Sequence, residues 1–375
     1  MAWTRRRWVE SVLVAGAVQP LRTLAAEGDI VVGQIGPFTG IPVPDAPQLN
    51  QGIKACFAQV NERGGINGRR VAFFEVDDTY SADGFAKAFG QAMQRKPVAL
   101  LDPVGSAALK RMLDDKMLDS SDVIVLNAIP GAEALRNPGH AKLFHIRAGD
   151  RQQIDKIVAH AVTLGVSELA VLYQNIVIGT SGLAMVQAAA GNALKVKAFE
   201  AKAEDASIAA VAKEVAKSGV KAVFVVGAPR FTADGIAQVR AQGTGQFVFA
   251  LSYVPAPMLA KIAGTGSRGV ALAQTYPNPS GVSLPVQREF QAAMKQSFAE
   301  VTAYTSFHLE GYISARVFTE AARRAKEVTP DGVARALRTM GEVDLGGFRV
   351  NFARSNIGSG YVDIGVVNGD GRLIY

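Results

Sequence analysis

Short runs of β-branched and other apolar residues recur along the chain, and each is followed by a stretch in which apolar residues return at helical spacing. In one such stretch the apolar positions Ile154, Ile157, Val158 and Ala161 fall on one face of a helix. The runs cover residues 30–35, 71–76, 98–101, 123–126, 169–173, 222–226 and 247–251. This alternation of strand and helix predicts an α/β protein with parallel sheets covered by helices on both faces.

A chain of 375 residues is longer than one hydrophobic core usually serves. This length, together with right-handed crossovers, favours two doubly wound units over one continuous sheet. Ligands of open parallel sheets bind at the carboxyl ends of the strands. We therefore expect two similar lobes with a cleft between them, and functional residues in the turns that follow the strands.

The charge pattern does not indicate a nucleic-acid partner. The formal net charge is +7, and Arg5, Arg6, Arg7 and Arg22 near the N-terminus supply part of this excess. The other basic residues are scattered among acidic ones, whereas nucleic-acid-binding surfaces gather their basic residues into patches. We therefore expect no nucleic acid among the partners.

The sequence also lacks a reactive or metal-binding constellation. None of the histidines is spaced as a metal pair or placed beside a plausible nucleophile. The four are His140, His145, His160 and His308. The loop at residues 33–37 lacks the glycine pattern of a dinucleotide site, and the single cysteine, Cys56, is expected to be a buried packing thiol. We therefore expect no enzymatic activity, no metal and no cofactor.

Residues 1–26 have the order of a cleavable secretory signal. Arginines 5–7 precede an apolar stretch at residues 12–18, and the small residues Ala25 and Ala26 come before Glu27. The segment at residues 4–9 also resembles a twin-arginine export signal, so both export routes remain open. No later stretch reaches the roughly 18 to 20 apolar residues of a membrane span. The prediction is a soluble periplasmic protein cleaved near Ala26.

Several short motifs follow one another along the chain in a specific order. Gly64 and Gly65, for example, supply the positive φ that ends a helix. The motifs are Gly36-Pro37-Phe38-Thr39-Gly40, Gly64-Gly65, Asp77-Asp78, Pro103-Val104-Gly105-Ser106, residues 179–183, Glu310-Gly311-Tyr312 and residues 345–350. Together they resemble the leucine/isoleucine/valine-binding family of periplasmic receptors, over nearly all of residues 30–375.

The resemblance implies a type I periplasmic binding protein fold, in which two Rossmann-like lobes are joined by three crossing segments. By similarity the crossings should lie near Arg147, Gln274 and Gly346. The N-terminal lobe would hold residues 27–147 plus 275–345, and the C-terminal lobe residues 148–274 plus 346–375. Closure of the two lobes about this hinge is the expected motion.

The resemblance also implies partners: a small-molecule ligand and the membrane permease of an ABC transporter, with the receptor working as a monomer. Two other functions remain open. The same fold serves periplasmic sensory receptors that present a ligand-bound form to a signalling partner, and it serves receptors for branched-chain amino acids.

The best candidate ligand residue is Ser106, with Gly105 beside it. Ser106 stands where a strand gives way to a helix, so its hydroxyl and the free amides of that first turn can donate to a carboxylate. The matching serine of the family holds the ligand carboxylate. The alternative is a serine that only caps its own helix.

Two departures from the family pattern bear on the ligand. The loop with Ala128 and Ile129 should offer a backbone carbonyl, but Pro130 stands where the family has a threonine hydroxyl. The family also uses an acidic residue for the ligand ammonium, and this chain has Ser252 and Tyr253 in that turn. Because an unpaired buried ammonium is costly, these departures argue against an α-amino acid ligand.

Other candidate ligand contacts come from several strand-end turns. Arg230 is a candidate for a bidentate grip on a carboxylate, Ile178 follows by the resemblance, and aromatic residues commonly line small-molecule pockets. The aromatic candidates are Phe38, Tyr80, Tyr253 and Tyr276. The set points to an organic or aromatic carboxylate, or to a neutral amide-like solute.

Overall fold

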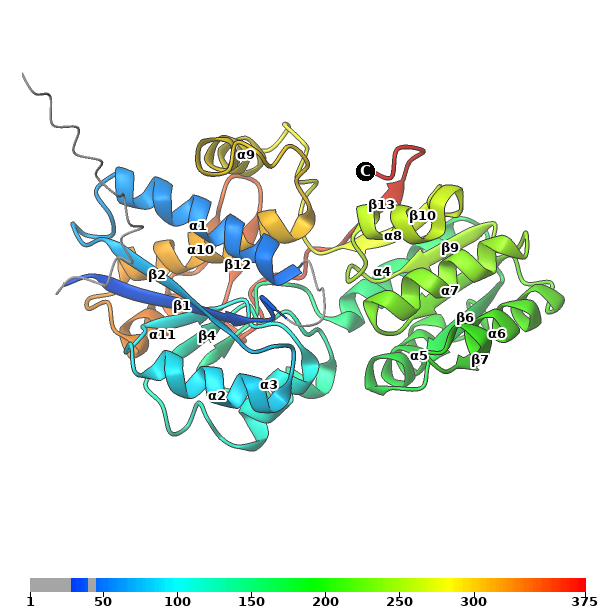
Figure 1. Ribbon diagram of the computed structural model, residues 1–375, viewed down its shortest axis with the longest axis horizontal. Coiled ribbons are helices and arrows are strands. Elements are labelled where there is room, and N and C mark those ends of the chain that lie inside the picture. Colours follow the sequence, from blue (N-terminus) through cyan, green and yellow to red (C-terminus); the bar gives the residue numbers. More distant parts are fainter. Residues whose placement is uncertain (1–27, 40–44) are drawn as a thin grey trace, which may run out of the picture.

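The computed structural model describes residues 28–39 and 45–375, which form two lobes lying side by side (Figure 1). The predicted signal segment, residues 1–26, lies outside the described residues. Each lobe is built on its own sheet, and most strand pairs are parallel. The α/β fold with two lobes, expected from the alternating pattern, is confirmed.

The N-terminal lobe contains a five-stranded sheet in the order β2-β1-β3-β4-β5. All its strand pairs are parallel. The strands are β1 (Ile30–Gly36), β2 (Val71–Asp77), β3 (Ala99–Leu101), β4 (Ile124–Leu126) and β5 (Leu143–Phe144). Apolar residues point to both faces of these strands, as a parallel sheet buried on both sides requires.

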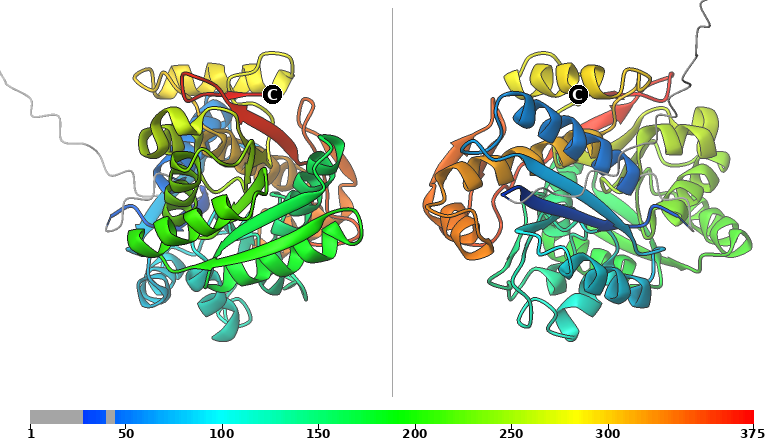
Figure 2. Two further views of the ribbon diagram at one scale, coloured as in Figure 1. Left: turned by 90° about the vertical axis from the view of Figure 1, so that its right-hand side faces the viewer. Right: turned by 60° about the vertical axis from the view of Figure 1, so that its left-hand side comes forward.

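Helices cover both faces of this sheet. One core joins the sheet to α1 (Asp45–Glu62), α9 (Pro285–Ser297), α10 (Ser306–Arg324) and α11 (Pro330–Thr339). A second core on the other face joins it to α2 (Ala82–Met93) and α3 (Ser106–Asp114). A short 3-10 turn, η1 (Glu133–Leu135), follows β4. The right-hand view of Figure 2 shows this layering of the N-terminal lobe.

The C-terminal lobe contains a seven-stranded sheet in the order β14-β13-β10-β9-β8-β6-β7. Its first strands are parallel, and the late strand β13 runs antiparallel to β10 and to β14. The strands are β6 (Glu168–Gln174), β7 (Lys195–Ala201), β8 (Ala222–Val226), β9 (Phe247–Ala250), β10 (Val270–Gln274), β13 (Asp363–Val367) and β14 (Leu373–Ile374).

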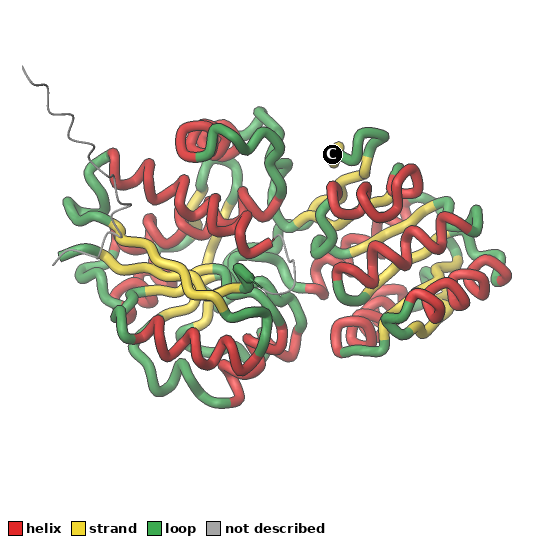
Figure 3. The backbone as a smooth tube through the Cα atoms, in the orientation of Figure 1, coloured by secondary structure: helices red, strands yellow, loops and turns green. Residues whose placement is uncertain are grey.

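Five helices and a 3-10 turn cover the second sheet, with strands between helical layers as Figure 3 shows by colour. The helices α4 (Asp150–Thr163) and α5 (Val177–Ala190) share one core with it. The helices α6 (Asp205–Lys217), α7 (Pro229–Ala241) and α8 (Ala256–Ala263), followed by η2 (Gly264–Ser267), share the other. No described helix is long and apolar enough to cross a membrane.

The chain passes between the lobes three times. The first passage lies between β5 and α4 and contains Arg147, and the second follows β10, which ends at Gln274. The third passage was predicted near Gly346, but the chain does not cross between the lobes there. Residues 346–352 stay with the N-terminal lobe because the hairpin of β11 (Glu342–Asp344) and β12 (Arg349–Asn351) buries Phe348, Val350 and Phe352 in its core. The chain then crosses between β12 and β13.

Candidate functional site

The carboxyl ends of both sheets meet where the two lobes contact each other. The turn after β9 carries Tyr253, whose hydroxyl accepts a hydrogen bond of 2.9 Å from the amide of Gly131, in the turn after β4. Parallel strands present their carboxyl ends at one edge of a sheet. We call the residues at each of these two edges the inter-lobe face of that lobe.

Ser106 begins α3 on the inter-lobe face, directly after Gly105. Gly105 has a φ of 100° and is the N-cap residue, and no side chain caps this helix. Ser106 is exposed, and its hydroxyl has no hydrogen-bond partner among the described residues. The alternative that Ser106 only caps its own helix is therefore not observed, and the first turn of α3 keeps unsatisfied donors.

Tyr80 lies against this helix start. A Cβ placed on Gly105 would be 3.4 Å from the Tyr80 ring, so glycine lets the ring pack closely there. The Tyr80 side chain remains 39% exposed, and its backbone has a φ of 58°. Its amide donates to Oδ1 of Asp78 at 2.9 Å, which fixes the turn after β2. Tyr80 is thus an aromatic surface held next to unsatisfied amide donors.

Asp77 and Asp78 organise the turns around Tyr80. Oδ1 of Asp77 accepts hydrogen bonds from the amides of Phe38 at 2.9 Å and Thr39 at 3.2 Å, which ties the turn after β1 to that after β2. Burial raises the pKa of Asp78 to about 6, and the nearby charge of Asp77 acts in the same direction. The Asp77-Asp78 motif therefore fixes the conformation of the turns after β1 and β2.

A small apolar cluster lies beneath these turns. It consists of buried side chains with the partly buried rings of Phe38 and Tyr253 packed against them. The buried members are Ala46, Leu49, Val104, Ile129 and Phe307. Two of the predicted aromatic contacts and the predicted Ile129 therefore come together, and Tyr253 brings the C-terminal lobe into the cluster.

Two predicted contacts are placed less favourably. Tyr276 is fully buried and stacks on Phe348 with ring centroids 5.2 Å apart, so in this conformation it presents no surface to a ligand. Ala128 is also fully buried. Tyr276 follows β10 at the second passage between the lobes, where packing under the hairpin takes its ring into the core.

The polar groups of the turn after β9 are used within the protein. Both the amide and the hydroxyl of Ser252 donate to Oε1 of Gln153, at 3.0 and 2.8 Å. The hydroxyl of Tyr253 donates to Oδ1 of Asp150 at 2.6 Å while accepting from Gly131. By the resemblance, this turn carries the ammonium-binding acid in the amino-acid receptors. Here it has no acidic side chain, and the hydroxyl groups of Ser252 and Tyr253 are already hydrogen-bonded within the protein.

Ile178 lies in the first turn of α5, after the carboxyl end of β6, and is partly buried. Its neighbours Ile176 and Val177 are 42% and 72% exposed. Such exposure is unusual for β-branched apolar residues, and it falls on the inter-lobe face of the C-terminal lobe. Sequence reasoning named Ile178 but not the two residues before it.

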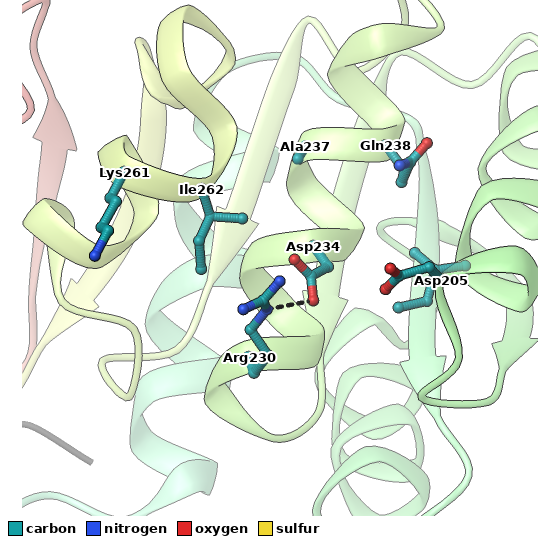
Figure 4. A pocket seen from close by; sticks show the side chains of 8 residues that line it. Asp205, Arg230, Asp234, Ala237, Gln238, Lys261 and Ile262 are labelled. Atoms are coloured by element: carbon teal, nitrogen blue, oxygen red, sulfur yellow. Dashed lines mark hydrogen bonds and ion pairs between the residues drawn. The ribbon is translucent and has the colours of Figure 1, made fainter. Parts of the chain in front are cut away.

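Arg230 takes a different position from the one expected. It lies in the first turn of α7 with 70% of its side chain exposed, and its Nε donates to Asp234 at 2.7 Å (Figure 4). It lines a surface pocket of about 340 Å³ between α6, α7 and α8, together with Asp205 and Lys261. Its guanidinium is thus paired within its own helix, and the predicted grip on a ligand carboxylate gains no support.

Sequence reasoning missed a buried polar network, which lies at the first passage between the lobes. Arg147 pairs with Glu310 at 2.6 Å, and both side chains are at most 1% exposed. Asn127 donates to Oδ1 of Asp102 at 2.9 Å and to Oε1 of Glu310 at 3.1 Å. Burial raises the pKa of Asp102 well above its usual range, and the charge of Glu310 adds to this. The Glu310-Gly311-Tyr312 motif was the available signal.

No described group of three or more His, Cys, Asp or Glu residues is placed to hold a metal ion. The inter-lobe face instead offers hydroxyl and amide donors at Ser106, an aromatic ring at Tyr80 and apolar side chains from both lobes. Such a mixture of apolar walls and a few fixed polar groups is typical of small-molecule sites.

Comparisons with known proteins agree with this fold. The sequence model of the family described as "Periplasmic binding protein" matches residues 29–371. An extracellular ligand-binding receptor from Verminephrobacter eiseniae is 50% identical, with a TM-score of 0.89, and the match covers 92% of this chain and 100% of that one. A substrate-binding periplasmic protein from Ralstonia solanacearum is 30% identical, with a TM-score of 0.83 and coverage of 92% and 99%.

More distant structures share the fold alone. A leucine binding protein from Thermotoga maritima is 18% identical with a TM-score of 0.80, and the match covers 92% of this chain and 97% of that one. A search of curated proteins found none that matches this chain. The family model and the two nearer structures show that the chain belongs to the periplasmic binding protein family, whose members bind solutes.

Proposed function

We propose that this protein is the solute-binding component of an ABC uptake transporter and that it binds a small organic carboxylate without an ammonium group. Closure of the two lobes would bring the solute against both inter-lobe faces, and the liganded form would then dock on the membrane permease. Solved relatives of the same fold include ABC transporter substrate-binding proteins, one of them in complex with leucine.

The observation that carries the ligand class is the start of α3. Ser106 presents a free hydroxyl, and the helix has no side-chain cap, so donors point outward where the positive end of the helix dipole favours an anion. Tyr80 beside it offers a ring face. The turn of Ser252 and Tyr253, whose polar groups are already bonded within the protein, offers nothing to an ammonium.

The test is a thermal-shift screen followed by calorimetry. The panel contains benzoate, phenylacetate and hexanoate, the corresponding amides, and the amino acids leucine and glutamate. We expect the carboxylates to raise the melting temperature and the amino acids to leave it unchanged. A response to amino acids only would overturn the proposed ligand class, and a response to amides but not acids would assign the neutral solute instead.

Ser106→Ala tests the proposed anion grip. Loss of a hydrogen bond to a charged group should weaken binding of the best carboxylate about tenfold or more. Ser283→Ala is the matched control, because Ser283 is also exposed and its hydroxyl also has no hydrogen-bond partner among the described residues, but it lies in the loop before α9. Equal affinities for both variants would contradict the role of Ser106.

A further inference from the structure

Arg147 lies in the first passage between the lobes and is anchored to the N-terminal lobe. Its Nη1 is 2.6 Å from Oε2 of Glu310 in α10, 163 residues away along the chain. Its backbone amide donates to Oδ1 of Asn127 at 2.8 Å, and its carbonyl accepts from Nη1 of Arg136 at 2.7 Å. Side chain and backbone are therefore both fixed to one lobe.

The same side chain reaches the other lobe. Nη2 of Arg147 donates to the hydroxyl of Ser252, in the turn after β9. The guanidinium also lies over the ring of Tyr253 at 5.0 Å from its centroid, and at 6.0 Å from the ring of Phe307. A guanidinium within about 6 Å of two ring centroids gains cation–π attraction from each ring, most strongly when it is buried as here. Arg147 thus holds Ser252 and Tyr253 of the C-terminal lobe against the N-terminal lobe.

The turn that Arg147 holds is rigid in its own lobe. Ser252 is bonded twice to Gln153 of α4, and Tyr253 is bonded to Asp150 at the start of the same helix. A force on this turn is therefore passed to α4 and to the sheet behind it. Because α4 begins only three residues after Arg147, the contact of Arg147 with this turn lies beside the first passage between the lobes.

We propose that Arg147 is the positioning residue of the hinge: its contacts with Ser252 and Tyr253 form the pivot about which the lobes turn. A contact beside a crossing segment moves little when the lobes rotate, so it can persist while more distant parts of the inter-lobe face approach each other. The pivot restricts the lobes to one rotation and fixes Tyr253 at the apolar cluster. The inference concerns the lobes themselves and does not depend on the ligand class.

The first test measures the distance between lobes without any ligand. Spin labels attached through Lys87→Cys on α2 and Lys213→Cys on α6 report it by pulsed electron resonance, because both positions are exposed and Cys56 is fully buried. We expect a narrow distance distribution in this background. Arg147→Gln should broaden it about twofold or more, because the lobes then sample additional orientations.

Two further variants keep the test decisive if Arg147→Gln does not fold. The double change Ser252→Ala with Tyr253→Leu removes the partners in the C-terminal lobe and leaves the Arg147–Glu310 pair intact, and it should broaden the distribution too. Arg316→Gln is the matched control, because Arg316 pairs with Glu289 inside the N-terminal lobe. An unchanged width in the double variant, or equal broadening in Arg316→Gln, would overturn the proposal.

Hydrogen exchange gives an independent reading of the same contact. The amides of Gly131 and Ser252 are bonded to side chains across this contact and behind it. Arg147→Gln should speed exchange in peptides that contain these two amides about tenfold or more and leave peptides of β6 and β8 unchanged. Uniformly faster exchange in all peptides would indicate a general loss of stability and would count against a pivot.

Discussion

His308 is a buried histidine at the start of α10, and its surroundings require the neutral ring. Nδ1 accepts from the amide of Thr305 at 3.0 Å, and Nε2 lies 2.9 Å from Oε1 of Gln51, so the proton belongs on Nε2. Burial lowers the pKa of His308 to about 4. The unfolded chain takes up a proton near its ordinary pKa of about 6.5, and the folded protein does so only below that lower value.

The pH dependence follows from this difference. Between about pH 6.5 and pH 4 the unfolded state binds the extra proton, so this residue makes the folded state less stable as the pH falls. Going from about pH 7.5 to about pH 5, the loss due to His308 should be about 2 kcal/mol. Urea unfolding at both pH values, compared between the parent chain and His308→Gln, isolates it. Identical pH dependence in the two chains would show that the histidine does not titrate as described.

Glu310 supports a second prediction at the scale of single residues. It is fully buried and is bonded to both Arg147 and Asn127. Burial raises the pKa of Glu310, and the charge of Arg147 opposes that rise. Glu310→Gln leaves the Arg147 charge buried without its partner, so we expect a loss of about 3–5 kcal/mol in the free energy of unfolding.

Glu289→Gln is the control for this loss. Glu289 pairs with Arg316, but its side chain is 42% exposed, so removing that charge should cost no more than about 1 kcal/mol. Chemical denaturation of the two variants gives the comparison. Similar losses in both would mean that burial does not set the strength of the Arg147–Glu310 pair.

Residues whose roles depend on nearby sequence were predictable, and those that depend on distant partners were not. Ser106 could be placed because a strand running into a helix fixes where its first turn points. The pairing of Arg147 with Glu310 spans 163 residues, and no local pattern encodes it. Tyr276 was expected at the ligand, but its ring is covered by the β11–β12 hairpin, which comes about 70 residues later in the chain. The sequence around Tyr276 does not indicate this distant contact.

At the scale of elements, helices α1 and α10 cross at two glycines. A Cβ on Gly52 would lie 2.0 Å from the carbonyl oxygen of His308, and one on Gly311 would lie 2.1 Å from that of Leu49. These distances are too short for any side chain, so the backbones touch directly. The glycine of the Glu310-Gly311-Tyr312 motif therefore has a packing reason, and the crossing also brings Glu310 to the hinge.

Gly52→Ala should therefore force the two helices apart. Overpacking of a tight contact costs about 1–3 kcal/mol, and the clash here is with rigid backbone, which favours the upper part of that range. Thermal unfolding of Gly52→Ala measures the loss. Gly90→Ala is the control: Gly90 lies in α2 with open space where its Cβ would be, so alanine there should be neutral or stabilise by up to about 1 kcal/mol.

Seven of the fourteen described strands could be predicted because a buried parallel strand is a continuous apolar run bounded by polar turns. The prediction divided the hairpin, placing β11 in the N-terminal lobe and β12 in the C-terminal lobe, whereas both strands pack in the N-terminal lobe. This error has a physical reason. Its strands alternate exposed and buried residues, and only Val343 and Val350 face inward. Such a short alternating pattern says that one face is covered, but it does not say which lobe covers it.

At the scale of the whole molecule, both inter-lobe faces carry apolar surface that folding alone leaves exposed. Tyr80 is 39% exposed on one lobe, and Ile176 and Val177 are 42% and 72% exposed on the other. All three follow the carboxyl end of a strand. Burying such surface is favourable by roughly 25 cal/mol for each Å² removed from water. Closure around an apolar solute would therefore be stabilised by the same residues that remain exposed without it.

Val177→Asp separates closure from folding. Because Val177 is 72% exposed in the unliganded protein, the melting temperature without ligand should change little, as for other surface substitutions of about ±0.5 kcal/mol. A buried aspartate in the closed form would be costly, so the affinity for the best carboxylate of the screen should fall about tenfold or more. Calorimetry measures the affinity, and small-angle scattering with and without ligand measures closure.

Val282→Asp provides the comparison that makes this result specific. Val282 is 63% exposed, close to the value for Val177, but it lies just before α9, at the far end of the loop that follows β10. Both variants carry the same added charge and should have the same stability. If only Val177→Asp loses ligand-induced compaction, the carboxyl ends of the two sheets close on each other. If both variants lose the same affinity and compaction, or neither loses any, the solute binds elsewhere.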